Sequence, residues 1–118
     1  MGERNVASAV SYYTAMAKKD IAGMGRHLHP KVHLISPMEK LSSKKAVLEA
    51  AGKLSKILEG IEVHTKFGSG NQAVLTYDML FPKPIGVCRA AAVMTFKDGL
   101  IVRNELFFDT QPFHTKKK

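Results

Sequence analysis

Three histidines in the first third of the chain have a spacing that could hold a metal ion. His27 and His29 form an H-x-H pair, and His33 follows four residues later. Imidazoles at such a spacing bind zinc or iron when a carboxylate or a third histidine joins them on one face. Pro30 interrupts the element between them. We therefore expect ordinary surface or hydrogen-bonded histidines and predict no metal and no cofactor.

Cys88 is the only cysteine. A single cysteine excludes an internal disulfide and a zinc site made of cysteines. A nucleophilic thiol needs a basic partner, and the sequence next to Cys88 offers only Arg89. The residue type therefore predicts a small, buried, unreactive thiol.

Length and composition predict one globular domain. The chain has 118 residues, of which 45% are hydrophobic and 24% charged. No apolar run approaches the ~20 residues of a membrane span, and residues 1–5 lack the apolar region of a signal peptide. We expect one domain over residues 1–110, a flexible basic tail over residues 111–118, a cytoplasmic protein and no membrane partner.

The net charge of +8 raises the question of nucleic acid. Three of the positive charges are the terminal run Lys116 to Lys118, and the others are spread over expected helix surfaces and turns. This distribution favours a solvated surface, so we predict no nucleic-acid partner.

The first half of the chain has helical periodicity. Apolar residues recur at helical spacing over residues 6–17, 21–28 and 47–58. Asp20 is expected to cap the second helix, and Ser42 or Ser43 the third. A short strand over residues 31–36 lies between the last two helices, a loop over residues 37–41 follows it, and Gly60 is expected to end the third helix in a left-handed conformation.

The second half has the alternating pattern of strands. We expect them over residues 61–67, 73–81, 85–96 and 100–109. Ile61, Val63, Thr65 and Phe67 share one face of the first of these strands. Asp98-Gly99 is a hairpin signal. The order α-α-β-α-β-β-β-β predicts an α+β domain, in which a curved antiparallel sheet wraps around three helices.

This order, with three sequence segments, resembles the nuclear transport factor 2-like superfamily and within it the SnoaL-like group. The segments are residues 12–20 (YYTAMAKKD), 29–32 (HPKV) and 93–101 (VMTFKDGLI). The resemblance covers about residues 7–108 and implies a cone with a deep pocket. Members of the superfamily include ketosteroid isomerase, polyketide cyclases, limonene epoxide hydrolase and transport adaptors, so the fold does not by itself define a function.

Ketosteroid isomerase uses a carboxylate base, a tyrosine and a protonated aspartate as an oxyanion donor; that aspartate is a worked example of pKa tuning. By the resemblance, the base falls on Ser36 before Pro37, and the aspartate falls on Ala92 or a neighbour. Neither Ser36 nor Ala92 can take the role of the carboxylate that it replaces. The tyrosine is matched by Tyr12 or Tyr13.

This sequence also lacks residues that two other family mechanisms use. Limonene epoxide hydrolase has an Arg-x-Asp pair, whereas this chain reads Arg89-Ala90-Ala91. Polyketide cyclases use an acid in the pocket. Asp78, Glu105 and Asp109 are the candidates here, but strand alternation puts Asp78 and Glu105 on the face away from the pocket. We expect these acids at the surface or in an interface and predict no catalytic residues.

The pocket implied by the resemblance is mostly apolar, with a few hydroxyl and amide groups, which suits a small apolar ligand. Its expected lining is Tyr12 or Tyr13, Met16, Met24, Ser36, Leu75, Tyr77, Met79, Cys88, Ala90, Ala92, Met94, Asn104, Leu106 and Phe108. The last strand is expected to bury Val102 together with Asn104. The same side chains could instead fill the core and leave no cavity.

The other face of the sheet is apolar enough to be covered. We expect it to form an isologous homodimer interface through Arg89, Ala91, Val93, Arg103, Glu105 and Phe107. The sequence thus predicts a dimeric protein that binds a small apolar or aromatic ligand. An isomerase or cyclase that uses a pocket tyrosine with another acid is an alternative, and a dimeric adaptor with a filled core is another.

Overall fold

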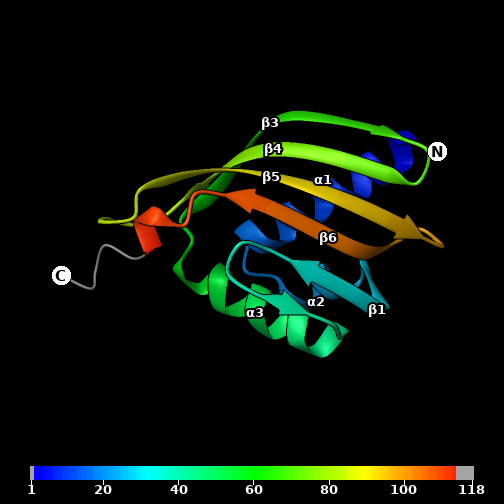
Figure 1. Cartoon of the computed structure of the whole chain (residues 1–118), viewed down its shortest axis with the longest axis horizontal. Coiled ribbons are helices and arrows are strands. Elements are labelled where there is room, and N and C mark those ends of the chain that lie inside the picture. The colour runs from blue at the N-terminus through cyan, green and yellow to red at the C-terminus, as the bar shows by residue number, and fades with distance from the viewer. Residues whose placement is uncertain (1, 114–118) are drawn as a thin grey trace.

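The computed structural model describes residues 2–113, which fold into three α-helices and one six-stranded curved sheet (Figure 1). The α+β class and the order of the predicted elements are confirmed. The elements, in chain order, are α1 (Gly2–Ala17), α2 (Ile21–Gly25), β1 (Leu28–Ile35), β2 (Lys40–Leu41), α3 (Lys44–Ile57), β3 (Gly60–Ser69), β4 (Gln72–Leu80), β5 (Val87–Lys97), β6 (Leu100–Phe108) and a 3-10 turn, η1 (Gln111–Phe113).

The sheet is mixed, so the prediction of a purely antiparallel sheet is wrong at one place. Strands β3 to β6 form the expected antiparallel meander, but β1 pairs in parallel with β6. The connection from β1 into the meander passes through α3, and a connection of that length permits a parallel pair. Residues 40–41, expected in a loop, form β2 and pair antiparallel with the end of β1.

The helices cover the concave face of the sheet. Helix α1 lies against β3 and β4, and α3 lies against β1 (Figure 1). Asp20 caps α2 as predicted, since its Oδ1 accepts from the Gly23 amide at 3.0 Å. Ser43 provides the cap of α3. Gly60 does not end α3, because α3 stops at Ile57 and Gly60 begins β3 without a left-handed φ.

Two register shifts change the faces that strict alternation predicts. In β3 the shift lies between Val63 and Thr65, so Phe67 pairs with Val74 on the convex face and is 57% exposed. The second shift lies between β5 and β6. Beside it, Ile101 is fully buried, while Val102 is only half-buried. The predictions for Thr65, Phe67 and Val102 are therefore wrong, because a bulge reverses the alternation beyond it. Asp98 and Gly99, with φ of 56° and 79°, form the predicted hairpin turn.

The chain continues to pack after β6. Residues 111–113, which we placed in the tail, form η1, and the Phe113 ring makes edge-on contacts with Phe81 and Phe108. The rest of the predicted tail lies outside the described residues. Among residues 2–113, no helix is long and apolar enough to cross a membrane.

Lys19 ties the end of α1 to the end of α3. It has a left-handed φ of 61°, and its Nζ donates to the carbonyl oxygens of Ser55 and Leu58, at 2.8 Å from the latter. The last carbonyls of a helix lack partners within the helix, and a cation there also complements the helix dipole.

We therefore expect Lys19→Met to lower the free energy of unfolding by about 1 kcal/mol, since it removes a charged donor from these carbonyls. Urea unfolding followed by circular dichroism measures the change. Lys18→Met removes the same charge from the neighbouring exposed residue and is the control. Equal losses in the two variants would show that the contact with α3 contributes nothing.

Candidate functional site

A cavity of about 560 Å³ lies between α1, α3 and the concave face of the sheet. Its wall is mainly apolar, and its only charged lining residues among those described are Glu39, Glu49 and Lys53, all exposed. The residues that were predicted to line a pocket and that line this cavity are Tyr12, Tyr13, Met16, Ser36, Tyr77, Met79, Asn104, Leu106 and Phe108.

The remaining predicted residues are buried in the core and do not line the cavity: Met24, Leu75, Cys88, Ala90, Ala92 and Met94. Ala90 illustrates why some of them do not reach it. Ala90 lies between Tyr77 and Phe108 in the sheet, and these larger side chains line the cavity, whereas the alanine methyl does not. Burial raises the pKa of the Cys88 thiol, which agrees with an unreactive cysteine.

Sequence reasoning missed the wall that α3 and the β1–β2 region provide. The stripe of α3 was recognised, but it was assigned to packing. Small side chains at Ala46, Ala50 and Ala51 leave space beside the sheet. The missed lining residues are Leu34, Met38, Glu39, Leu41, Ala46, Val47, Glu49, Ala50, Ala51, Lys53, Leu54, Ile57 and Phe113.

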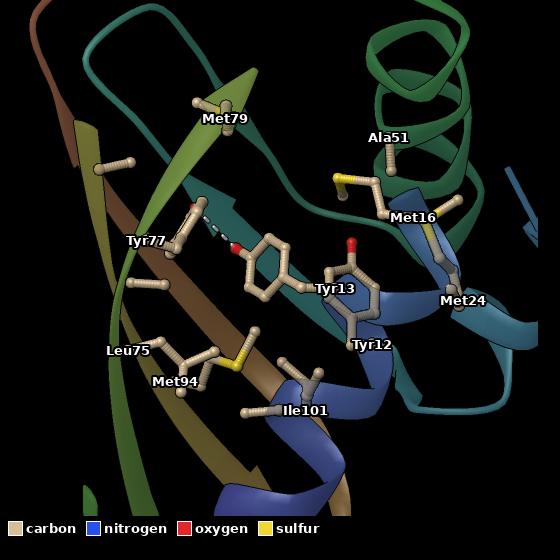
Figure 2. Close-up of a cluster of buried hydrophobic side chains, with 14 of the residues drawn as sticks. Tyr12, Tyr13, Met16, Met24, Ala51, Leu75, Tyr77, Met79, Met94 and Ile101 are labelled. Carbon is tan, nitrogen blue, oxygen red and sulfur yellow. Dashed lines mark hydrogen bonds between the residues drawn. The ribbon is translucent and has the colours of Figure 1, made fainter. Parts of the chain in front are cut away.

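Three polar side chains meet at the inner end of the cavity. The Tyr77 hydroxyl donates to the Tyr13 oxygen at 3.1 Å, and Asn104 Nδ2 donates to the same oxygen at 3.3 Å. The Tyr13 and Tyr77 rings lie side by side with centroids 4.6 Å apart (Figure 2). All three residues are at most 3% exposed. This cluster, Tyr13–Tyr77–Asn104, is a hydrogen-bonded polar group in the buried part of a mainly apolar wall.

Both candidate tyrosines of α1 face inward. Tyr12 and Tyr13 are each 2% exposed, line the cavity and contact each other edge to face at 5.2 Å. Burial raises the pKa of Tyr12, Tyr13 and Tyr77, so all three are neutral phenols at physiological pH. They can donate hydrogen bonds but cannot act as bases.

A model of the SnoaL-like domain matches residues 9–104. The chain belongs to the SnoaL-like domain family. No curated protein matches this sequence. The structural likeness extends over nearly the whole chain and confirms the nuclear transport factor 2-like fold that the sequence suggested.

Three solved structures illustrate that likeness. A protein from Kribbella flavida DSM 17836 has a TM-score of 0.89 and 27% identity, with 95% of this chain and 92% of that chain covered. TerC, co-crystallised with polyporic acid, has a TM-score of 0.79 and 20% identity, with 95% of this chain and 96% of that chain covered. A steroid delta-isomerase from Pseudomonas aeruginosa has a TM-score of 0.74 and 22% identity, with 90% of this chain and 80% of that chain covered.

Neither of the two positions that the resemblance matched to the ketosteroid isomerase carboxylates, Ser36 and Ala92, carries a carboxylate. Ser36 lines the cavity, but its Oγ accepts from the amides of Met38 and Glu39 and donates to the Glu39 carbonyl. Its hydroxyl therefore holds the turn after β1. Ala92 is fully buried and has no proton to donate.

The acids that were considered as catalytic candidates lie outside the cavity wall. Glu105 pairs with Arg103 at 3.3 Å, and Asp109 accepts from the Gln111 amide at 3.0 Å. Asp78 is buried on the convex side, where Arg89 Nε lies 2.6 Å from Oδ1 and His64 Nε2 lies 2.8 Å from Oδ2. None of these carboxylates lines the cavity.

Among the described residues, the only group with metal-ligating geometry is Glu62, His64 and Asp78, whose ligand atoms lie within 4.8 Å of one another. The three histidines noted in the sequence are not part of it. Arg89 already holds the Asp78 carboxylate, so a cation there would meet a positive charge. The Asp78 carboxylate instead accepts from His64 and Arg89, which links β3, β4 and β5.

The convex face carries all the side chains that were predicted to form an interface. Ala91 pairs with Phe107 and Val93 with Glu105, and Arg89 and Arg103 flank them. Phe107 is 49% exposed and Val87, on the same face, is 63% exposed. Phe67 extends this apolar surface through its pairing with Val74. Whether a second copy covers it remains a prediction.

Asp78 should make stability depend on pH in the acid range. The hydrogen bonds from Arg89 and then His64 lower the pKa of Asp78 from 3.8 to about 2. A lowered pKa in the folded state means that the ionised carboxylate stabilises the fold above its ordinary pKa. That contribution is lost as the pH falls from about 3.8 towards about 2.

We expect Asp78→Asn to be less stable than the wild type at pH 7 and to lose less stability between pH 5 and roughly pH 2. Urea midpoints measured across this range test the expectation. Glu105→Gln removes a half-buried carboxylate from the same face and should keep the wild-type loss. An unchanged pH dependence in Asp78→Asn would contradict the assignment.

Proposed function

We propose that this SnoaL-like domain binds a small, largely apolar molecule in the cavity, without the carboxylates that its enzymatic relatives use. The observation that carries the proposal is a chamber of about 560 Å³ whose buried wall is apolar and neutral. Pockets of 300–1,000 Å³ with a few convergent polar groups are typical of small-molecule sites. The co-crystallisation of TerC with polyporic acid supports it by analogy of fold.

Enzymatic isomerisation or cyclisation is the alternative, supported by the steroid delta-isomerase with this fold. It requires a carboxylate near the ligand. The lining acids of the described chain are Glu39 and Glu49, which are exposed. Both side chains are exposed to solvent and lie apart from the buried part of the wall, so binding without catalysis is the better-supported function.

The binding test uses a variant that fills the chamber. We expect saturating 2-acetylnaphthalene, at about ten times Kd, to raise the Tm by roughly 5 °C. Ala50→Phe, on the lining side of α3, should abolish this shift because the ring occupies the space. Lys45→Phe places the same ring on an exposed position of α3 and should retain it. Equal shifts in the two variants would contradict binding in the cavity.

We also propose that the convex face forms a homodimer, in keeping with its exposed Phe107, Val87 and Phe67. Contiguous exposed apolar surface on a charged protein favours the association of two copies over full hydration.

We also propose a cytoplasmic location, because a single buried cysteine suits a reducing compartment.

Light scattering should give twice the 13.0 kDa mass of one chain at micromolar concentration. We expect Phe107→Arg to give the monomer mass, because two like charges would face each other across an isologous interface. Met38→Arg changes an equally exposed apolar residue (52% against 49%) at the mouth of the cavity and should remain dimeric. A monomeric wild type would refute the dimer.

A further inference from the structure

A second hollow, of about 250 Å³, lies on the surface where α1 meets α2. Its volume is several times the ~30 Å³ that one water molecule occupies in the liquid, so it has room for a polyatomic group. It shares no lining residue with the cavity between the helices and the sheet. Most of its wall is polar, and the lining residues are Ser11, Thr14, Ala15, Lys18, Asp20, Gly23, Arg26 and His27.

Helix α1 and the turn after it place three hydrogen-bond donors along one side of this hollow. Ser11, Thr14 and Lys18 follow one another at intervals of three and four residues, which puts them on one helix face. All three are exposed, and none of their side chains has a hydrogen bond or an ion pair with another described residue. Two hydroxyls and an ammonium group are therefore available to a molecule that enters.

The residues that follow α2 add donors from the other side. Arg26 carries a guanidinium, whose planar array of N–H groups matches the oxygens of a phosphate. His27 is half-buried, and burial together with the charge of Arg26 lowers the pKa of its imidazole. The His27 ring is therefore neutral at pH 7 and carries one N–H, which adds a donor without adding charge.

One acid, Asp20, also lines the hollow, but its carboxylate already has partners. Its Oδ1 accepts from the Gly23 amide at 3.0 Å, and its Oδ2 lies 4.0 Å from Arg26 Nη2. That ion pair is exposed and long, so it leaves Arg26 free to donate elsewhere. Lys18 and Arg26 give the hollow two positive charges against one negative charge. A cation would be repelled there, whereas an anion would find several donors.

We propose that this hollow binds a phosphate group, either as free phosphate or as the monoester of a small molecule. A phosphate presents acceptor oxygens in several directions, and the donors around the hollow come from two elements. Charge-assisted hydrogen bonds from Lys18 and Arg26 supply most of the affinity, and the Thr14 hydroxyl adds a neutral one. This site is independent of the binding function proposed for the apolar cavity.

Chemical-shift titration of the isotope-labelled protein with inorganic phosphate, at pH 7 and constant ionic strength, tests the site. We expect the backbone amide signals of Thr14, Lys18 and His27 to follow a saturating curve with a Kd of about 1 mM, as suits a few charge-assisted bonds at an exposed site. Chloride should leave these signals in place. Shifts that grow linearly, without saturation, would overturn the proposal on the wild type alone.

A matched pair of variants separates a site from general attraction to a basic protein. Lys18→Met keeps an unbranched side chain and should weaken phosphate binding about ten-fold, because it removes a charged donor. Lys45→Met removes the same charge from an exposed position of α3 outside the hollow and should bind as the wild type does. Equal weakening in the two variants would show attraction to the net charge of +8 alone and would overturn the site.

The source of the phosphate group is read from a second titration, with glycerol phosphate. Tighter binding of this monoester than of inorganic phosphate supports a small-molecule ester as the ligand, and the reverse order supports the free ion. Saturable binding of neither compound would overturn the proposal. Binding of 2-acetylnaphthalene in the apolar cavity is measured separately, so failure of one site leaves the other untouched.

Discussion

The curvature of the sheet is the constraint on which the other features depend. Two register shifts, in β3 after Val63 and between β5 and β6 near Thr95, interrupt the ladder of the long strands. Bulges bend a strand and increase its twist, so a sheet with bulges encloses more space than a flat one. Helix α3, with alanines at the contact, does not fill that space. The cavity is thus a consequence of bent strands and small helix residues together.

A mainly apolar chamber restricts which polar groups its buried wall can contain. A phenol or an amide on such a wall needs a partner, because burial without one is costly. Tyr13, Tyr77 and Asn104 meet this requirement jointly, through bonds to one oxygen. The buried carboxylate, Asp78, lies instead on the convex side, where Arg89 and His64 are its partners. Along these strands, alternation therefore separates charged from neutral polar side chains, with one face covered by helices and the other open.

Sequence periodicity was sufficient for the three helices and the five longer strands, though not for β2 or η1, and for part of the cavity wall. Tyr77, Met79, Asn104 and Phe108 were predicted to face inward, since strict alternation holds along β4 and along β6 beyond its bulge. Phe67 and Val102 were misplaced because one inserted residue reverses a face, and no residue type marks the insertion. The contribution of α3 was missed for another reason. An alanine stripe looks the same in sequence whether it packs tightly or leaves a void.

The two faces of the sheet are coupled through the same strands. On β5, Ala90 faces the core and Ala91 faces outward, and on β6 their partners are Phe108 and Phe107. Phe108 lines the cavity while Phe107 stands on the proposed interface. A partner that rigidifies β5 and β6 from outside would also fix the positions of Phe108 and Asn104 inside. Pre-organised walls reduce the ordering cost of binding, so dimer formation would increase ligand affinity without contributing any residue to the cavity.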